Sequence, residues 1–339
     1  MHFIIASKEN DPVAGGLLYT WLSEEMREST EKHIRECCNQ RLLERFKDNK
    51  EAKTLLEREL TVLQKSNLFA DLCLMEETAK ISKERGYPVM PNGSLAGSLA
   101  AYLLDISTID PLVGTGFDLS FEVVWNRPSF ELWIAPSVRK KLKKRLERKF
   151  KYTPAGCRLY IRIPMPDSDI CEQVGKCAKK ARRIPCFSDF DEKVCMHVAE
   201  RLIQDAENES ERRIEGDLQD LERCDFLMLV QLFGYLKGSF KTPKKLSDLN
   251  DPHKIVLRDE LYREMISCGV PGYEAADLSY SGIWPKGKQR TLELLANHNA
   301  SDDLLSQIQN TENLWPAGPC ISRLQLLCAL AWYELNRYL

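Results

Sequence analysis

Two Gly-Ser pairs, Gly93-Ser94 and Gly97-Ser98, stand four residues apart in the segment 91–112, PNGSLAGSLAAYLLDISTIDPL. The apolar run that follows predicts a largely buried helix over 95–106. Backbone amides at the start of a helix can bind an anion, so this segment is a candidate phosphate site. The same small residues also let a helix start pack closely against a sheet, and we favour this structural role.

A second candidate site is the strongly basic segment 138–151, VRKKLKKRLERKFK. Its spacing predicts a helix whose buried face carries Leu142, Leu146 and Phe150. The basic side chains could contact a nucleic-acid backbone, dock on an acidic partner, or form a solvated face, and DNA is the partner that we carry forward. The candidate nucleic-acid contacts are Lys140, Lys141, Lys144, Arg145, Arg148 and Lys151, with Lys179, Lys180, Arg182 and Arg183 adjoining them.

The composition narrows the class of protein. The formal net charge is −2, so any nucleic-acid contact must come from a local patch. Twelve cysteines and five histidines form no Cys-x-x-Cys pair and no zinc spacing, so we expect free thiols in a reducing cytosol and no metal site. No apolar run reaches about 18 residues and the start has no long signal region, so we expect a cytoplasmic protein without membrane contact.

Helices dominate the predicted secondary structure. Apolar spacing of three and four predicts helices within 17–86, ending at Gly86, and again from 190 onward. Alternating residues predict strands at 129–137 and 156–165, separated by the basic helix. Residues 241–254 predict a loop. The expected fold class is α+β, with a small mixed sheet among many helices.

Six segments carry an ordered series of motifs. Residues 58–112 contain Gly-Tyr-Pro-Val, both Gly-Ser pairs and Ile-Asp-Pro-Leu, and 260–288 contain Glu-Ala-Asp-Leu. Together with 119–126, 148–165, 225–240 and the final helix, they resemble the alpha subunit of bacterial DNA polymerase III, the C-family replicative polymerase.

The resemblance implies a thumb–palm–fingers core with a nucleotidyltransferase-like palm of the polymerase beta type. It divides the chain into a helical, thumb-like 1–57, a palm-like 58–188 and a helical, fingers-like 189–339.

The resemblance also implies a two-metal site, which the family builds on Pro-Asp-x-Asp-x-Asp. The acidic positions of that motif fall here on Ser129, Glu131 and Trp133, and Glu131 is the only acid in NRPSFELWIAPS. The segment that carries the family's third aspartate is missing, although a second alignment puts Asp189 in its place. Glu131 and Asp189 are therefore candidate vestigial catalytic residues. They are too few to hold two Mg²⁺ ions.

The family's phosphate contacts are altered as well. Its Gly-Arg-Gly-Ser motif is Asn92-Gly93-Ser94 here, without the arginine, and its Leu-Arg-Arg-Ala motif is Ser-Tyr-Ser-Gly at 279–282. The bidentate arginines that would clamp a triphosphate are thereby lost. The remaining candidate nucleotide or phosphate contacts are Gly93, Ser94, Gly97, Ser98, Lys286 and Lys288.

These changes predict a degenerate relative, a pseudoenzyme without polymerase activity. We expect a DNA-binding or accessory protein in DNA replication or repair that needs no cofactor. Its expected partners are DNA, bound through 138–151, and replication proteins. Two alternatives stay open. One is an active, divergent metal-dependent nucleotidyltransferase that uses Mg²⁺ with Glu131, Asp189 and Asp191. The other is a protein–protein assembly module that kept only the packing of its ancestor.

Overall fold

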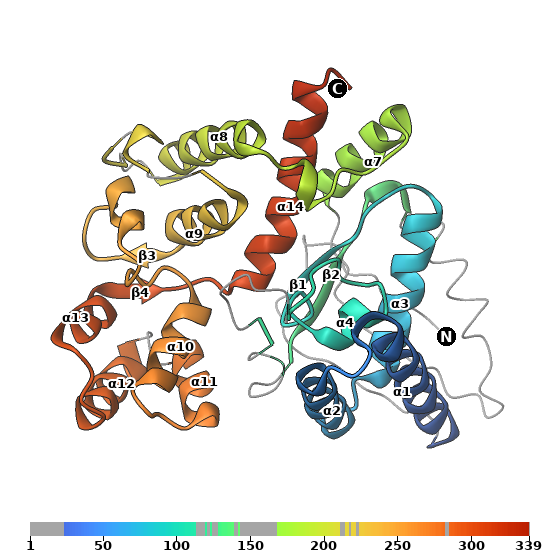
Figure 1. Ribbon diagram of the computed structural model, residues 1–339, viewed down its shortest axis with the longest axis horizontal. Coiled ribbons are helices and arrows are strands. Elements are labelled where there is room, and N and C mark those ends of the chain that lie inside the picture. The colour runs from blue at the N-terminus through green and yellow to red at the C-terminus, as the bar shows by residue number, and fades with distance from the viewer. Residues whose placement is uncertain are drawn as a thin grey trace. The chain divides into compact units, whose positions relative to one another are not determined.

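The computed structural model describes residues 24–112, 119–120, 123, 128–138, 142, 168–210, 214–216, 218–221, 224–281 and 285–338 (Figure 1). The chain divides into two compact units. Unit 1 is drawn from 1–113 and 127–184, and unit 2 from 114–126 and 185–339. Buried apolar side chains are present in each unit, so each has a core of its own.

Long helices form much of the described part of unit 1: α1 (Glu24–Phe46), α2 (Lys50–Lys65) and α3 (Phe69–Glu84). The Asn49 side chain caps α2 by accepting a hydrogen bond from the Ala52 amide at 3.1 Å. Leu56, Leu60 and Leu63 recur on one face of α2 and are buried. In Figure 1 these helices carry the blue and cyan part of the ribbon.

The remaining described elements of unit 1 are shorter: β1 (Met90–Gly93), α4 (Leu99–Leu103), β2 (Phe130–Trp133) and α7 (Asp169–Ala181). The strands β1 and β2 pair antiparallel, with Asn92 opposite Glu131 and Gly93 opposite Phe130. Phe130 and Leu132 are buried, whereas Glu131 and Trp133 are partly exposed. This alternation places the Glu131 side chain on the more open face of the pair.

Unit 2 is a second helical body with its own two-stranded sheet. Its core includes the apolar helix α14 (Ala317–Leu335), against which α8 (Glu192–Ser210) and α9 (Phe226–Lys237) pack. Glu334 of α14 forms an ion pair with Arg201 of α8 at 2.6 Å. The other described elements are η1 (Phe187–Asp189), η2 (Leu218–Asp220), β3 (Ser239–Phe240), η3 (Leu246–Asn250), α10 (Arg258–Ser267), α11 (Gly272–Ser281), α12 (Pro285–Asn297), α13 (Asp302–Asn310) and β4 (Thr311–Asn313).

The predicted α+β class is confirmed: the described chain is mostly helical, with two-stranded sheets β1–β2 and β3–β4. Gly86 follows α3 with φ +74°, as its predicted role at the helix end requires. The strand expected over 129–137 is present but shorter. The predicted strand 156–165 and most of the helix 138–151 lie outside the described residues.

Two local predictions need correction. The helix expected over 95–106 is reduced to the five residues of α4, because turns precede Ser98 and Asp105 adopts φ +58° after the helix. The loop expected over 241–254 contains the short helix η3. Within the described part of the chain, no helix is both long enough and apolar enough to span a membrane.

Candidate nucleotide-binding site

The first Gly-Ser pair lies at the end of β1 and contacts Ser129, the residue before β2. Gly93 has φ +62°, and a Cβ at this position would lie 2.4 Å from the Ser129 carbonyl oxygen, so only glycine fits. The Ser94 hydroxyl accepts a hydrogen bond from the Ser129 amide at 2.7 Å and donates to the Ser129 carbonyl at 3.1 Å. Ser94 is buried, and its hydroxyl group is hydrogen-bonded within the strand pair.

The second Gly-Ser pair begins α4 and meets a carboxylate of the protein itself. The Ser98 hydroxyl caps the helix by accepting from the Ala101 amide at 3.1 Å. It also donates to Glu59 of α2 at 2.8 Å. The backbone amides of Leu99 and Ala100 donate to the two Glu59 oxygens at 2.8 and 2.9 Å. A carboxyl group of the protein therefore occupies the position at which an external phosphate would bind.

Glu59 is fully buried, and its surroundings shift the pKa of its carboxyl group in two opposite directions. Burial raises its pKa to about 7, while the bonds from the Ala100 amide, the Leu99 amide and the Ser98 hydroxyl lower it. The three donors favour the ionised form, but burial outweighs them, so the carboxyl group changes its charge near pH 7. The carboxylate also complements the positive end of the helix dipole at α4.

Two arginine side chains donate hydrogen bonds to backbone carbonyls at the C-terminal end of α4. Arg41 donates to the Leu103 carbonyl at 2.6 Å, and Arg45 donates to the Tyr102 carbonyl at 2.8 Å. Both arginines also pair with Asp105, at 3.0 and 2.6 Å. The short helix is thus fixed at each end by charged side chains of α1 and α2.

Glu131, the candidate catalytic acid, is paired with a neighbouring amide. The side-chain nitrogen of Asn92 donates to the Glu131 carboxylate at 2.5 Å across the β1–β2 pair. Ser129 and Trp133, at the two flanking positions on the same face, supply no carboxylate. The family's pair of Mg²⁺ ions therefore does not fit this strand, because one carboxylate supplies too few ligands for two ions.

The second candidate acid, Asp189, lies in unit 2, whereas Glu131 lies in unit 1. Asp189 accepts hydrogen bonds from the Cys186 amide at 2.9 Å and from the Cys186 thiol at 3.4 Å. Asp191 accepts from the Val194 amide at 2.9 Å at the start of α8. Both aspartates thus have local bonding roles.

The two candidate lysines of the fingers-like region lie in α12. Lys288 donates to the carbonyls of Thr311 and Gln309 and so ties α12 to β4. Partial burial, aided by the charge of Lys241, lowers its pKa. The Lys286 side chain lies outside the described residues.

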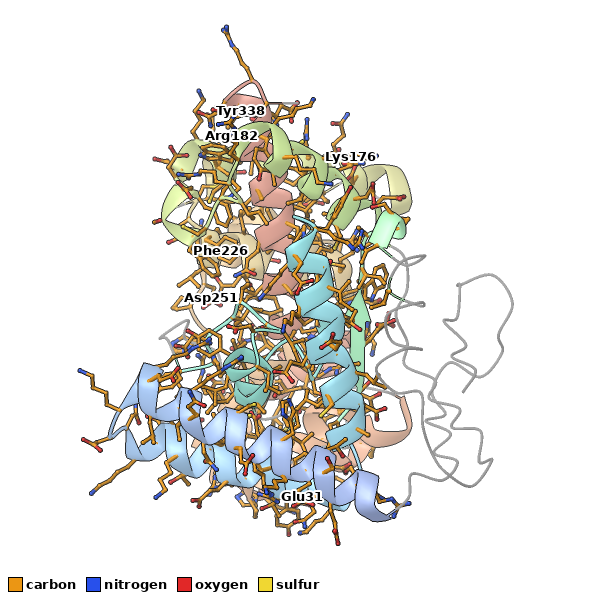
Figure 2. The ribbon with its side chains drawn as sticks, turned by 90° about the vertical axis from the view of Figure 1, so that its right-hand side faces the viewer. Glu31, Lys176, Arg182, Phe226, Asp251 and Tyr338 are labelled. Carbon is orange, nitrogen blue, oxygen red and sulfur yellow. The ribbon has the colours of Figure 1, made fainter. Side chains whose placement is uncertain are left out.

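The candidate nucleic-acid contacts can be located only in part. Lys140, Lys141, Lys144, Arg145, Arg148 and Lys151 all lie outside the described residues. The adjoining α7 is described, and Figure 2 labels Lys176 on it and Arg182 at its end. Lys179 lies 3.8 Å from the centre of the Tyr87 ring, so it packs against an aromatic face while remaining exposed.

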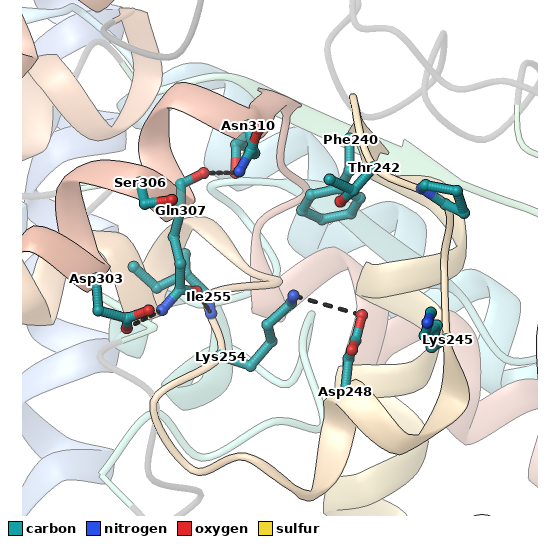
Figure 3. A pocket seen from close by; sticks show the side chains of 12 residues that line it. Phe240, Thr242, Lys245, Asp248, Lys254, Ile255, Asp303, Ser306, Gln307 and Asn310 are labelled. Atoms are coloured by element: carbon teal, nitrogen blue, oxygen red, sulfur yellow. Dashed lines mark hydrogen bonds and ion pairs between the residues drawn. The ribbon is translucent and has the colours of Figure 1, made fainter.

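Unit 2 contains a pocket of about 520 Å³ beside η3 and α13 (Figure 3). Its positive side chains face acids: Lys254 lies 3.4 Å from Asp248, and Lys245 lies 3.4 Å from Glu215. Asp248 also accepts a hydrogen bond from the Tyr235 hydroxyl at 2.6 Å. These pairings leave the pocket with balanced charge, which does not favour a polyphosphate.

Sequence reasoning missed Glu59 as the partner of the Gly-Ser helix. A signal was available, because Glu59 lies between Leu56, Leu60 and Leu63 on the apolar face of α2. An acid on such a face is buried and needs hydrogen-bond donors. The sequence does not reveal that those donors lie about 40 residues further along the chain.

Comparison with known proteins supports the resemblance over much of unit 1. Residues 32–131 match the family described as the bacterial DNA polymerase III alpha NTPase domain. The matched range includes α2, α3, β1 and α4, and it ends at Glu131 in β2. This part of the chain is therefore related to a family of the DNA replication machinery.

Individual relatives give the same assignment. The chain is 33% identical over 102 residues to DNA polymerase III subunit alpha of Thermotoga maritima, covering 28% of this chain and 12% of that protein. It is 42% identical over 80 residues to the Escherichia coli K12 subunit, covering 23% and 7%. The Campylobacter jejuni subunit is 34% identical over 83 residues, with the same coverage. The match thus spans at most 12% of the length of these three relatives.

Proposed function

We propose that this chain is a DNA polymerase III alpha-related protein that does not transfer nucleotides. It acts instead as a DNA-binding or accessory protein in DNA replication or repair. The observation that carries the proposal is the Glu59 carboxylate, which accepts the amides of Leu99 and Ala100 at the Gly-Ser helix. A triphosphate at this position would find both amides already bonded to Glu59, and above a pH of about 7 it would also meet a buried negative charge.

The acid on β2 supports the same proposal. Transfer of a nucleotide by two metal ions needs several carboxylates around one point, and Glu131 is a single acid already bonded to Asn92. The β1–β2 pair would correspond to part of the family's palm sheet, and α8 to α14 to a fingers-like region. In this proposal the palm-like region keeps the packing of the family but lacks the carboxylates that bind the catalytic metal ions.

The proposed DNA contact is the basic segment 138–151, which carries nine lysines and arginines. Such a density of positive charge favours the phosphate backbone of a nucleic acid and predicts binding that weakens steeply with salt. A relation to a replicative polymerase makes DNA the appropriate polyanion and replication proteins the appropriate partners.

Catalysis is tested by nucleotide incorporation on a primed DNA template with Mg²⁺ or Mn²⁺. We expect no extension by the wild-type chain, and the same result for Glu131→Ala. An active polymerase III alpha subunit, assayed alongside, shows that template, primer and nucleotides are competent. Metal-dependent extension that Glu131→Ala abolishes would overturn the proposal in favour of an active, divergent enzyme.

DNA binding is tested by fluorescence anisotropy with labelled duplex and primed DNA over a salt series. The triple change Lys140→Glu, Lys141→Glu and Lys144→Glu should weaken binding at least about tenfold, because three phosphate contacts are lost. The matched control is Lys47→Glu, Lys50→Glu and Lys53→Glu, the same charge change at exposed residues around the start of α2. If the wild-type chain shows no salt-sensitive binding, or both triple variants bind equally, the assembly-module alternative is favoured.

A further inference from the structure

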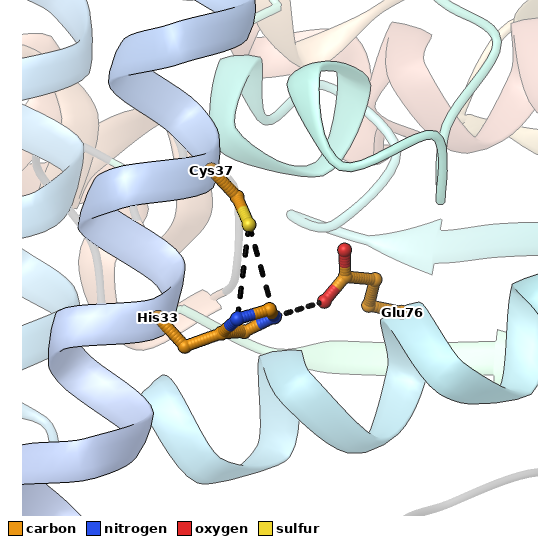
Figure 4. Close-up of side chains that lie close together, drawn as sticks. All are labelled: His33, Cys37 and Glu76. Atoms are coloured by element: carbon orange, nitrogen blue, oxygen red, sulfur yellow. Dashed lines mark hydrogen bonds and ion pairs between the residues drawn. The ribbon is translucent and has the colours of Figure 1, made fainter.

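Three side chains of metal-ligating type converge between α1 and α3. His33 and Cys37 stand one helical turn apart on α1, and Glu76 faces them from α3 (Figure 4). The imidazole, thiol and carboxylate each offer one ligand atom, and these atoms all lie within 4.8 Å of one another. We propose that His33, Cys37 and Glu76 bind one Zn²⁺ ion, a role independent of the proposed function.

The distances between the ligand atoms suit a tetrahedral ion. Around Zn²⁺ with ordinary bond lengths, neighbouring S, N and O ligands lie about 3.4–3.6 Å apart. His33 Nε2 lies 3.9 Å from Cys37 Sγ and 2.8 Å from Glu76 Oε2. Entry of the ion requires the imidazole and the carboxylate to separate by about 0.6 Å. The ion then replaces the hydrogen bond that now joins them.

The set of ligands selects the metal. A thiolate and an imidazole favour Zn²⁺ over Mg²⁺ and Ca²⁺, which prefer oxygen ligands. Three protein ligands leave a fourth position that a water molecule completes. The ligand spacing of four residues on α1 brings His33 and Cys37 onto one face, as a shared ion requires.

Exposure and charge favour binding at this position. The His33 side chain is 50% exposed and the Glu76 side chain 18% exposed, so an ion can enter from solvent. The carboxylate of Glu76 supplies a negative charge for the cation. Zinc is bound by the thiolate, so binding releases the thiol proton and strengthens as the pH rises.

The neighbouring thiols are distinct from the site. The Cys38 thiol is buried and directed at the Ala100 carbonyl at 4.0 Å. The Cys73 thiol, on α3, is directed at the Thr30 carbonyl at 3.8 Å. The ion would therefore join α1 to α3 through the three named side chains.

The site is tested on the full chain by titration with Zn²⁺ against a chromophoric chelator, and with Co²⁺ as a spectroscopic probe. We expect one Zn²⁺ per chain and a Co²⁺ spectrum with both a thiolate charge-transfer band and the visible bands of a tetrahedral site. At a hundredfold excess over Kd, Zn²⁺ should raise Tm by about 5 °C.

Variants separate this site from adventitious binding to other thiols. Cys37→Ser, His33→Gln and Glu76→Gln should each weaken Zn²⁺ binding at least about tenfold, and Cys37→Ser should abolish the charge-transfer band. The controls are Cys186→Ser and His253→Gln, the same exchanges at exposed residues of unit 2, which should change nothing. Because His33 is half-exposed, His33→Gln should fold even if Cys37→Ser does not. Undiminished Zn²⁺ binding in folded His33→Gln, or less than one ion per wild-type chain, would overturn the proposal.

Discussion

Glu59 shows how one buried side chain decides what a helix start can bind. Its carboxylate accepts two backbone amides and one hydroxyl within 2.9 Å. The acid comes from α2, far from the Gly-Ser pairs in sequence. A phosphate would have to displace it, and the buried charge would then lose all three donors at once.

Truncation of this residue gives the first prediction. Glu59→Ala should lower the free energy of unfolding by about 2–4 kcal/mol, because it leaves buried amides without an acceptor and opens a cavity. The measurement is urea unfolding followed by helical ellipticity.

Glu57→Ala is the matched control, since Glu57 lies on the exposed side of the same helix. Its free energy of unfolding should stay within about 0.5 kcal/mol of the wild type. Equal losses in the two variants would show that Glu59 does not support α4.

At the scale of elements, the β1–β2 pair depends on Gly93. The residue combines φ +62° with a backbone approach that excludes a side chain. Gly86 shares a positive φ of +74°, but a Cβ there would meet only flexible Lys179 atoms at 3.7 Å. The two glycines therefore separate the cost of backbone strain from the cost of collision.

Gly86→Ala should lower the free energy of unfolding by about 1 kcal/mol, from backbone strain alone. Gly93→Ala should cost about 3 kcal/mol or more, because the Ser129 backbone must also move. Thermal and urea unfolding of both variants measure the difference. Indistinguishable losses would mean that the close contact between Gly93 and Ser129 relaxes freely.

Local patterns predicted the elements better than the site. The leucines of α2 and the alternation of Phe130 and Leu132 gave a helix and a strand, because both depend on spacing along the chain. Gly86 was predicted as a helix end for the same reason. The bond of Glu59 to α4 and that of Glu76 to His33 join residues about 40 apart, so they depend on tertiary packing that spacing does not encode. The expectation of no metal site rested on spacing along the chain, and Glu76 lies 43 residues from His33.

On the scale of the whole molecule, each unit contains a buried glutamate at a helix start. In unit 2, Glu260 accepts the Val256 and Leu257 amides at 2.8 and 3.0 Å at the beginning of α10. Burial raises its pKa, as it does for Glu59. Both residues therefore link the stability of their unit to pH in the same direction.

A raised pKa means that the folded chain holds a proton which the unfolded chain has already released. For Glu59, stability should therefore fall as the pH rises from about 4.5 through about 7, by at most about 1.4 kcal/mol per pH unit, and Glu260 contributes a fall of the same sign. Urea unfolding between pH 5 and 8 measures this slope. In Glu59→Gln, which cannot titrate, the slope should be shallower; a stability that rises over this range, or equal slopes in both proteins, would contradict the assignment.

The Glu59 contact also bears on how the protein responds to its surroundings. A segment ordered by a bound nucleotide has a folded population that follows the nucleotide concentration, because ligand binding and folding are linked. In this chain the amides of Leu99 and Ala100 are bonded to the carboxyl group of Glu59, which belongs to the chain itself and is present at any nucleotide concentration. Their hydrogen exchange should therefore be slow without nucleotide and remain unchanged when nucleotide is added, so the order of this segment is independent of the metabolic state of the cell.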